Sequence, residues 1–497
     1  MIPLLIAASA LATTSQPQPQ TQTQTQPQVD AADPKVAAEA SGNPPARLVV
    51  ETGPPVVLPL WLSQPVFKAI NYEEDYSALA SPERRVTTWQ KLKYVPLAGG
   101  VYASFGGELR LRPELRLNER WGRGAQDRDG NFQQRTRLWT DLHLGSHLRA
   151  FVDIQHATSA GLDSGELITD EGRADFHQAF VEADFDIGEA KVRARVGRQE
   201  MGLGAFRVFD MREGANTRRA LDIARLLVGQ GSWDAGFLAG NTVREDPASF
   251  NDKTNDDYSL WGFHGGVDYG AGHSHRIEML FLSTDRLGYN FATPTPGRDR
   301  RDTLSLRAFG RFGQWDYDVE GIGQRGHFRD LDVKAWYVSL NGGRTLSHPW
   351  KPRIGVRLDV ASGDRNPNDG TMGTYNALFA RPLTYNGDLN PQNLTVLQPV
   401  LAFTPARGFS IDLTTAWLWR TSTRDAVYAF SGQAVRGGAE SDRRYVAWRV
   451  TGAARYLLNQ HVTLGLYANL TKAGAVFREN GVSKDQLYVA PYLTLRF

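Results

Sequence analysis

The chain has 497 residues, a formal net charge of only +2 and no cysteine. The near-neutral charge gives no overall field of the kind that attracts a protein to nucleic acid, and the missing cysteines exclude zinc–thiolate sites, disulfides and thiol catalysis. Mean hydropathy is −0.40, and no stretch approaches the roughly 18 apolar residues that a membrane-spanning helix needs.

The first 70 residues are predicted to precede the folded part of the chain. Residues 1–12 have a short apolar core and a small–x–small ending, which predicts a signal peptide. This signal is atypical because no Lys or Arg stands before the apolar core. Residues 13–70 are rich in Gln and Pro, a composition that buries little surface, so we expect a disordered periplasmic leader.

After a short pre-barrel segment, residues 71–99, the chain repeats alternating strands separated by Gly-, Asp-, Asn- and Arg-rich links. In one such strand Leu109 and Leu111 fall on one face, and Arg110 and Arg112 fall on the other. At roughly 22 residues per strand and connection, the roughly 400 residues of this region predict about 16 to 18 strands. We therefore predict an all-β fold: a transmembrane antiparallel β-barrel of about 18 strands over residues 100–497.

Connections between the expected strands alternate in length, as an outer-membrane barrel requires. Short links such as Gly313-Gln314 are expected to be periplasmic turns. The long segments are expected to be extracellular loops, some of them folded into the lumen: residues 202–225, 242–257, 284–301, 362–398 and 421–444.

The last strand alternates without a break and ends on Phe497. A soluble protein rarely leaves so apolar a strand at an unpaired edge, whereas a barrel in lipid pairs that edge and exposes its apolar face to hydrocarbon. The ending resembles the terminal strand of bacterial outer-membrane barrels, which the barrel-assembly machinery recognises through its final Phe. This resemblance implies a bacterial outer-membrane location and an interaction with that machinery.

Arginines occupy the polar, inward face of many strands and outnumber the inward acids. A guanidinium suits carboxylates, and rings of Arg are how pores favour anions. Inward arginines can also pair with acids and brace the wall, and both roles stay open for each of them. The wall candidates for contact with a passing solute are Arg110, Arg112, Arg193, Arg195, Arg353 and Arg357.

Two further segments, the Gly- and Arg-rich residues 197–220 and the Asp- and Asn-rich residues 362–379, stand out as functional loops. Together with residues 72–77, 92–97 and 106–110, they resemble the alginate export family of outer-membrane barrels. The resemblance implies an 18-stranded barrel whose electropositive pore passes alginate or polymannuronate out of the cell. It also implies pore contacts at Arg198, Arg207, Arg218, Arg219, Asp364, Arg365 and Asn366.

Other chemistry is weakly represented. Asp364, Asn366 and Asn368 partly match a calcium loop, but the glycine comes one residue late at Gly370, and Tyr375 replaces the bidentate Glu. This favours a turn built by Asx side chains, with a structural calcium as the alternative. Because no P-loop, HExxH or GxSxG motif is present, we expect no catalytic residue, metal site or other cofactor.

The sequence thus predicts a monomeric outer-membrane porin that is not an enzyme. Its partners would be membrane lipid and an anionic polysaccharide leaving the cell by passive diffusion. The alternative is a general porin for uptake of small anionic or sugar solutes, and a hydrolase embedded in the barrel is a third hypothesis.

Overall fold

The computed structural model describes residues 67–497, apart from 124–125, 127–129, 163–168, 293–294, 383–388, 430 and 480–482. The predicted signal peptide and the leader up to residue 66 lie outside the described residues. Within the described part, no helix is both long enough and apolar enough to cross a membrane.

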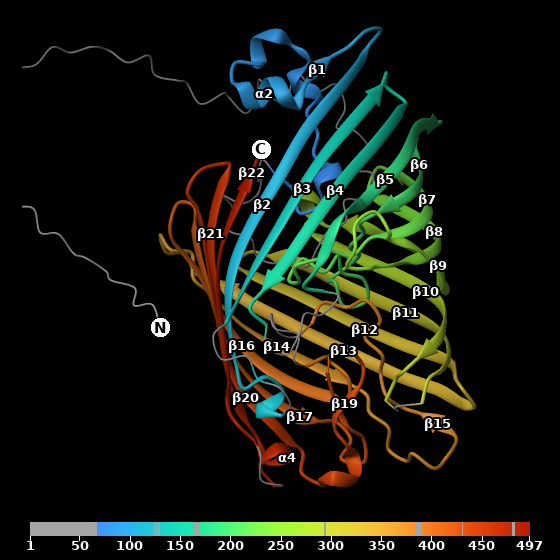
Figure 1. Cartoon of the computed structure of the whole chain (residues 1–497), viewed down its shortest axis with the longest axis vertical. Coiled ribbons are helices and arrows are strands. Elements are labelled where there is room, and N and C mark those ends of the chain that lie inside the picture. Colours follow the sequence, from blue (N-terminus) through green and yellow to red (C-terminus); the bar gives the residue numbers. More distant parts are fainter. Residues whose placement is uncertain are drawn as a thin grey trace, which may run out of the picture. The chain divides into compact units, whose positions relative to one another are not determined.

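One antiparallel sheet closes on itself and forms a barrel (Figure 1). Closure comes from β2, which pairs with β3 on one side and with β22 on the other. Eighteen strands of the described residues form the wall, as predicted: β2 (Val101–Leu117), β3 (Asn131–Leu144), β4 (Leu148–Ala160), β5 (Gly172–Ile187), β6 (Ala190–Gln199), β7 (Leu221–Gln230), β8 (Trp233–Arg244), β9 (Lys253–Tyr269), β10 (His275–Tyr289), β11 (Gly297–Phe312), β12 (Trp315–Phe328), β13 (Leu331–Thr345), β14 (Arg353–Ala361), β16 (Leu394–Ala406), β17 (Phe409–Arg420), β20 (Tyr445–Leu457), β21 (Val462–Ala473) and β22 (Gln486–Arg496).

The remaining elements are short. The two-residue strands β1 (Val95–Pro96) and β15 (Thr371–Met372) add to the barrel sheet, and β18 (Val427–Tyr428) pairs with β19 (Ala434–Arg436) separately. The helices are η2 (Asn71–Glu73), η3 (Ser77–Ala80), η4 (Pro82–Arg84), α2 (Thr88–Lys93), α3 (Glu119–Gly122), η5 (Ala271–His273), η6 (Gly438–Glu440) and α4 (Ala475–Arg478).

The wall is apolar outside and polar inside. On β3, for example, the Leu138 side chain is 56% exposed, whereas Arg135 and Arg137 are buried in the interior. The same alternation repeats around the ring, so the outer surface is a belt of exposed Leu, Val, Phe and Trp side chains. This is the arrangement of a barrel whose outer face meets lipid.

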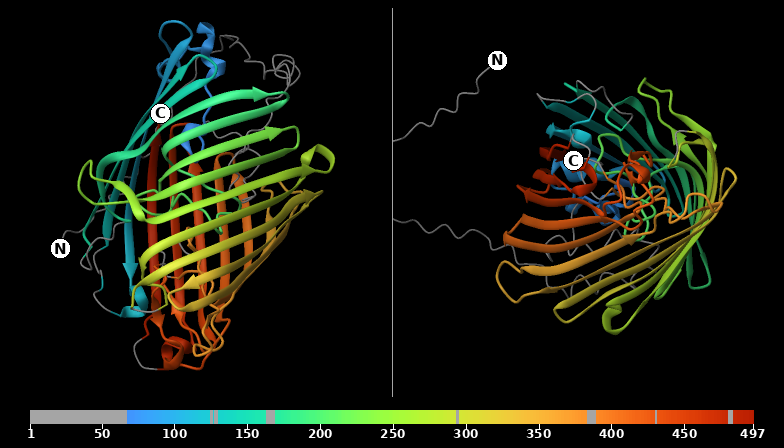
Figure 2. Two further views of the ribbon diagram at one scale, coloured as in Figure 1. Left: turned by 90° about the vertical axis from the view of Figure 1, so that its right-hand side faces the viewer. Right: turned by 90° about the horizontal axis from the view of Figure 1, so that it is seen from below.

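Long and short connections lie at opposite ends of the barrel (Figure 2). Most short turns share an end with the start of β2 and with Phe497. The long connections leave the other end, where the two-residue turn 329–330 between β12 and β13 also lies. The strands extend into the predicted loops. In place of the loop predicted over residues 284–301, β10 runs to Tyr289 and β11 already begins at Gly297. Near these ends outward residues are charged, as in the Arg298–Asp285 pair at 2.5 Å, so the apolar alternation stops before the strand does.

The closing strand pair ends on a matched contact between Gly107 and Phe497. The two residues exchange both backbone hydrogen bonds, at 3.2 and 3.1 Å. A Cβ on Gly107 would lie 2.4 Å from the Phe497 ring, so any other residue at this position would force the ring to shift. The Lys93 ammonium of α2 donates a 3.0 Å hydrogen bond to the backbone oxygen of Phe497.

Two segments fill the lumen from opposite ends. Residues 200–220 follow β6 and fold inward, where Phe209 pairs with Phe379 of the segment after β14. From the other end, residues 67–76 enter the barrel, and the Tyr72 hydroxyl donates to the Glu200 carbonyl at 2.7 Å. The view along the barrel shows these segments inside the ring of strands (Figure 2).

Candidate functional site

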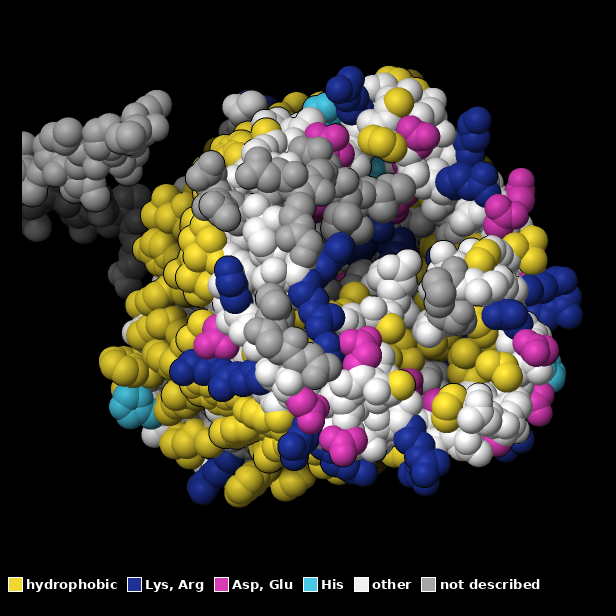
Figure 3. Space-filling view, turned by 60° about the horizontal axis from the view of Figure 1, so that its bottom comes forward, with side chains coloured by type: hydrophobic (Ala, Val, Ile, Leu, Met, Phe, Trp, Pro, Cys, Tyr) yellow, Lys and Arg dark blue, Asp and Glu magenta, His cyan; other side chains and the backbone are white. Residues whose placement is uncertain are grey.

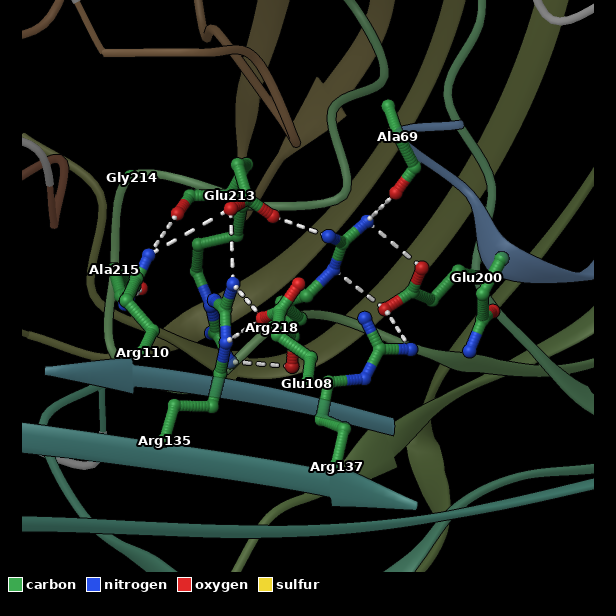
Figure 4. A network of polar contacts seen from close by, with 12 residues as sticks. Ala69, Glu108, Arg110, Arg135, Arg137, Glu200, Glu213, Gly214, Ala215 and Arg218 are labelled. Carbon is green, nitrogen blue, oxygen red and sulfur yellow. Dashed lines mark hydrogen bonds and ion pairs between the residues drawn. The ribbon is translucent and has the colours of Figure 1, made fainter. Parts of the chain in front are cut away.

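The centre of the lumen holds a network of arginines and acids in which the two inserted segments meet (Figure 4). Arg218 is fully buried, and its guanidinium lies 2.6 Å from one Glu200 oxygen and 2.8 Å from the other. It also pairs with Glu213 and donates to the Ala69 carbonyl at 2.9 Å. One side chain thus joins the loop after β6 to the N-terminal segment.

Wall arginines of β2 and β3 complete this network. Arg135 lies 2.7 Å from Glu108 and 2.9 Å from Glu213. Arg110 donates to the carbonyl of Glu213 at 2.9 Å, and Arg112 donates to the carbonyl of Gly214 at 2.7 Å. In this structure both predicted pore arginines of β2 therefore hold the backbone of the inserted loop.

The loop carboxylates of the network stay ionised at neutral pH. Burial alone would raise the pKa of Glu200, but the guanidinium groups of Arg137 and Arg218 hold that pKa at about 2. The same competition, with Arg135 and Arg218 as the main cations, sets the pKa of Glu213 below its ordinary value. Each loop carboxylate is therefore a charged anchor and not a proton donor.

The other predicted wall arginines also face inward and are also paired. Arg193 lies 2.7 Å from Asp184, and Arg195 lies 2.6 Å from Glu182. On the far side of the barrel, Arg353 pairs with Asp316 at 2.5 Å and Arg357 pairs with Asp359 at 2.7 Å. Asp184 and Glu182 lie on the neighbouring strand β5, Asp316 lies two strands away on β12, and Asp359 lies on β14 itself. The lumen charge is therefore more balanced than the inward arginines alone suggest.

The predicted loop residues are spread over three places. Arg207 lies inside, 2.6 Å from Glu320 of β12, and fixes the inserted loop to the opposite wall. Alternation along β6 puts Arg198 on the outer face, where it pairs with Asp222 at 2.8 Å. It therefore lies apart from the lumen arginines.

Residues 364–370 lie at the rim of the barrel. Arg365 and Asn366 are exposed, and the Asp364 carboxylate accepts a 2.9 Å hydrogen bond from the Asn366 N–H. The Asp369 carboxylate accepts from the Thr371 N–H in the same way, at 2.9 Å. These contacts are those of Asx turns, and the three predicted residues are not brought together with the lumen network.

Two arginines, Arg219 and Arg286, lie against aromatic rings. Arg219 donates to the carbonyls of Asp210 and Phe379, at 3.3 and 3.0 Å, and its guanidinium lies 5.1 Å from the centroid of the Phe379 ring. Arg286 of β10 lies 4.9 Å from the Tyr258 centroid and 3.7 Å from the Tyr289 centroid. Within the described residues, neither arginine forms an ion pair with a carboxylate.

An aromatic face attracts a guanidinium without neutralising its charge, so the ring contacts leave Arg219 and Arg286 positively charged. The rings that hold them are themselves stacked, with 5.3 Å between the centroids of Phe379 and Tyr258. Burial and the nearby Arg212 lower the pKa of Arg219 to about 10, which leaves it protonated at neutral pH.

Sequence reasoning missed Arg286, Glu200 and Glu213. Residues 284–301 were predicted to be a loop, and the only local signal for Arg286 is Tyr289 three residues later.

On the face that carries the long loops, Lys and Arg side chains gather at a hollow between the loops (Figure 3).

Comparisons with known proteins agree with this architecture. A family model for alginate export matches residues 101–489. Among solved structures, the chain is similar to a BenF-like porin from Pseudomonas fluorescens Pf-5, with 10% identity over 80% of this chain and 99% of that one and a TM-score of 0.55. It is also similar to OccD3 (OpdP) of Pseudomonas aeruginosa, with 11% identity over 85% and 97% of the two chains and a TM-score of 0.53.

A third similar structure is OpdK of Pseudomonas aeruginosa with vanillate, with 9% identity over 79% of this chain and 99% of that one and a TM-score of 0.51. At such low identity these structures bear on the fold alone. Among curated proteins, none matches the chain.

Fold and family point to the same class of protein. The closed barrel with its apolar outer belt is that of a bacterial outer-membrane porin, and families with this fold typically carry out no chemistry on their solutes. The family match covers nearly the whole barrel. The chain belongs to the alginate export family.

Proposed function

We propose that this protein is an anion-selective channel that passes an anionic polysaccharide of the alginate or polyuronate type out of the cell by passive diffusion. The observation that carries the proposal is the pair Arg219 and Arg286, two lumen cations held by aromatic faces and carbonyls. Membership of the alginate export family supports a uronate as the substrate.

The mechanism is electrostatic and requires no conformational cycle. A uronate carboxylate that leaves water loses solvation, and a guanidinium with free N–H groups replaces part of it. Arginines such as Arg135, whose charge is balanced by Glu108 and Glu213, stiffen the wall and add little net attraction. Binding then stays weak and divided over few sites, so the polymer can move on.

A second candidate is a general porin for uptake of small anionic or sugar solutes. It is favoured by the two segments that fill the lumen, because they narrow the path available to a polymer. The similar structure of OpdK with vanillate adds a precedent for a carboxylate ligand in this fold. Block of the current by a uronate oligomer, but not by vanillate, distinguishes export of the polymer from this alternative.

The proposal extends to the remaining partners. The channel acts as a monomer without cofactor or enzymatic activity, and the barrel-assembly machinery recognises it through Phe497. Within this proposal the turn at residues 364–370 is an Asx turn without calcium, which its Asp364 and Asp369 contacts support.

The test is the reversal potential of the purified channel in a salt gradient across a planar bilayer. The double variant Arg219→Gln/Arg286→Gln is expected to lose most of the anion preference. The control Arg219→Lys/Arg286→Lys keeps both charges and should keep the preference, while binding carboxylates less well because the planar fork is gone. Unchanged selectivity in the Gln variant would remove the basis of the proposal.

A further inference from the structure

The seam between the first and last barrel strands is interrupted. Pairing of β2 with β22 runs without a break from Glu108↔Arg496 to Leu111↔Leu493 and resumes only at Leu115↔Val489. The register is the same on both sides of the gap. At its centre Pro113 therefore stands opposite Pro491.

This position is one at which an antiparallel ladder needs two hydrogen bonds. Gly107 and Phe497 exchange both N–H···O bonds, and such pairs recur at every second residue along antiparallel strands. Counting by twos from that pair reaches Pro113 and Pro491. Proline has no N–H, so both bonds are missing, and the carbonyl of each proline lacks the donor that a regular ladder would supply.

A groove opens at the same place. Its volume is about 480 Å³, and both prolines line it. Its other apolar lining residues are Leu115, Phe132, Ala160 and Val489. Pro113 and Pro491 are exposed and Phe132 is 45% exposed, so the groove lies on the outer face of the wall, within the apolar belt.

The chemistry of the groove specifies its occupant. On this face the surrounding medium is lipid, and apolar side chains hold hydrocarbon rather than water. Backbone carbonyls at membrane depth nevertheless require a hydrogen-bond donor. A single molecule meets both demands if it has an acyl chain and a hydroxyl or amide N–H near one end of that chain.

We propose that the groove binds an acyl chain of an outer-membrane lipid, and that a hydroxyl or amide group of this lipid donates to the carbonyl of Pro113 or Pro491. The bound lipid completes the closing seam of the barrel at the one position where the two strands cannot complete it themselves. This inference rests on the outer-membrane location and does not depend on what the channel transports.

The experiment is native mass spectrometry of the full, delipidated protein after addition of lipid A, whose acyl chains carry hydroxyl and amide groups. A diacyl phosphatidate of similar chain length, which lacks both donors, is the comparison lipid. We expect at least tenfold more bound lipid A than phosphatidate. Equal binding of the two lipids would overturn the role of the carbonyls.

Variants locate the site. Pro113→Thr/Pro491→Thr restores both N–H groups and should lower lipid A binding about tenfold, whereas Pro399→Thr on β16, an outward proline opposite Val356 and away from the groove, should leave it unchanged. Ala160→Trp fills the groove from β4 without touching the ladder and should have the same effect as the double variant. Undiminished binding in either groove variant would overturn the proposal.

Discussion

Arg218 is the residue whose loss should release both inserted segments. It is buried with Glu200, both at 0% side-chain exposure, and its guanidinium also holds the Ala69 carbonyl of the N-terminal segment. Replacement by Met keeps the length of the side chain and removes the charge. The loop around Glu213 is then held by the remaining ion pair of Glu213 with Arg135 and by its backbone contacts to Arg110 and Arg112.

The size of the effect follows from the burial of the pair. Removing one partner of a buried ion pair costs about 3–5 kcal/mol. Glu200 keeps a second cation, Arg137 at 3.2 Å, so we expect the lower end, about 3 kcal/mol. At about 1.4 kcal/mol per factor of ten, the ratio of docked to undocked loop falls roughly 100-fold.

A spin label on the loop measures this release. The chain contains no cysteine, and a side chain at Gly214 would have no atom within 4 Å, so Gly214→Cys offers a unique and unobstructed attachment point. In this labelled background Arg218→Met should change the electron paramagnetic resonance spectrum from that of a slowly moving label to that of a rapidly moving one. The control Arg219→Met, which removes contacts to carbonyls but no ion pair, should leave most of the label slow. Equal mobility in the two variants would refute the anchoring role of Arg218.

Two further predictions concern pH and closure. The pKa of Glu200 is lowered from 4.5 to about 2. The stabilisation of the docked loop by its ion pairs is therefore complete above about pH 4.5 and is lost as the pH falls through about 2. The spin label should still move slowly at about pH 5, and release of the loop at that pH would contradict the assignment. Gly107→Leu places a side chain into the Phe497 ring and should destabilise closure of the barrel by about 1–3 kcal/mol or more. On detergent gels the variant should lose the compact band that the unboiled protein gives. The control Gly321→Leu, with open space around the glycine, should keep that band.

The barrel itself could be predicted because its signal is local. Alternation such as Leu109, Arg110, Leu111, Arg112 requires only neighbouring residues, and the strand count follows from length. The inward position of the wall arginines follows from the same parity. The same alternation along β6 places Arg198 on the outer face, although Arg198 lies in a segment that resembles a pore loop of the family.

What each inward arginine contacts could not be predicted, because the partners are distant in the sequence. Arg135 meets Glu213, 78 residues later, only after the loop has folded into the lumen. Arg286 is held by Tyr258 of the neighbouring strand β9, a contact that depends on register. The facing prolines at the seam likewise become visible only once Phe497 fixes the register of β22 against β2.

The central claim is tested most directly by the planar-bilayer current of the unaltered channel in a salt gradient, with oligomannuronate then added to one side. The account predicts a reversal potential of the sign for anion selectivity and a current that decreases as the oligomer is added. A cation-selective pore would contradict it.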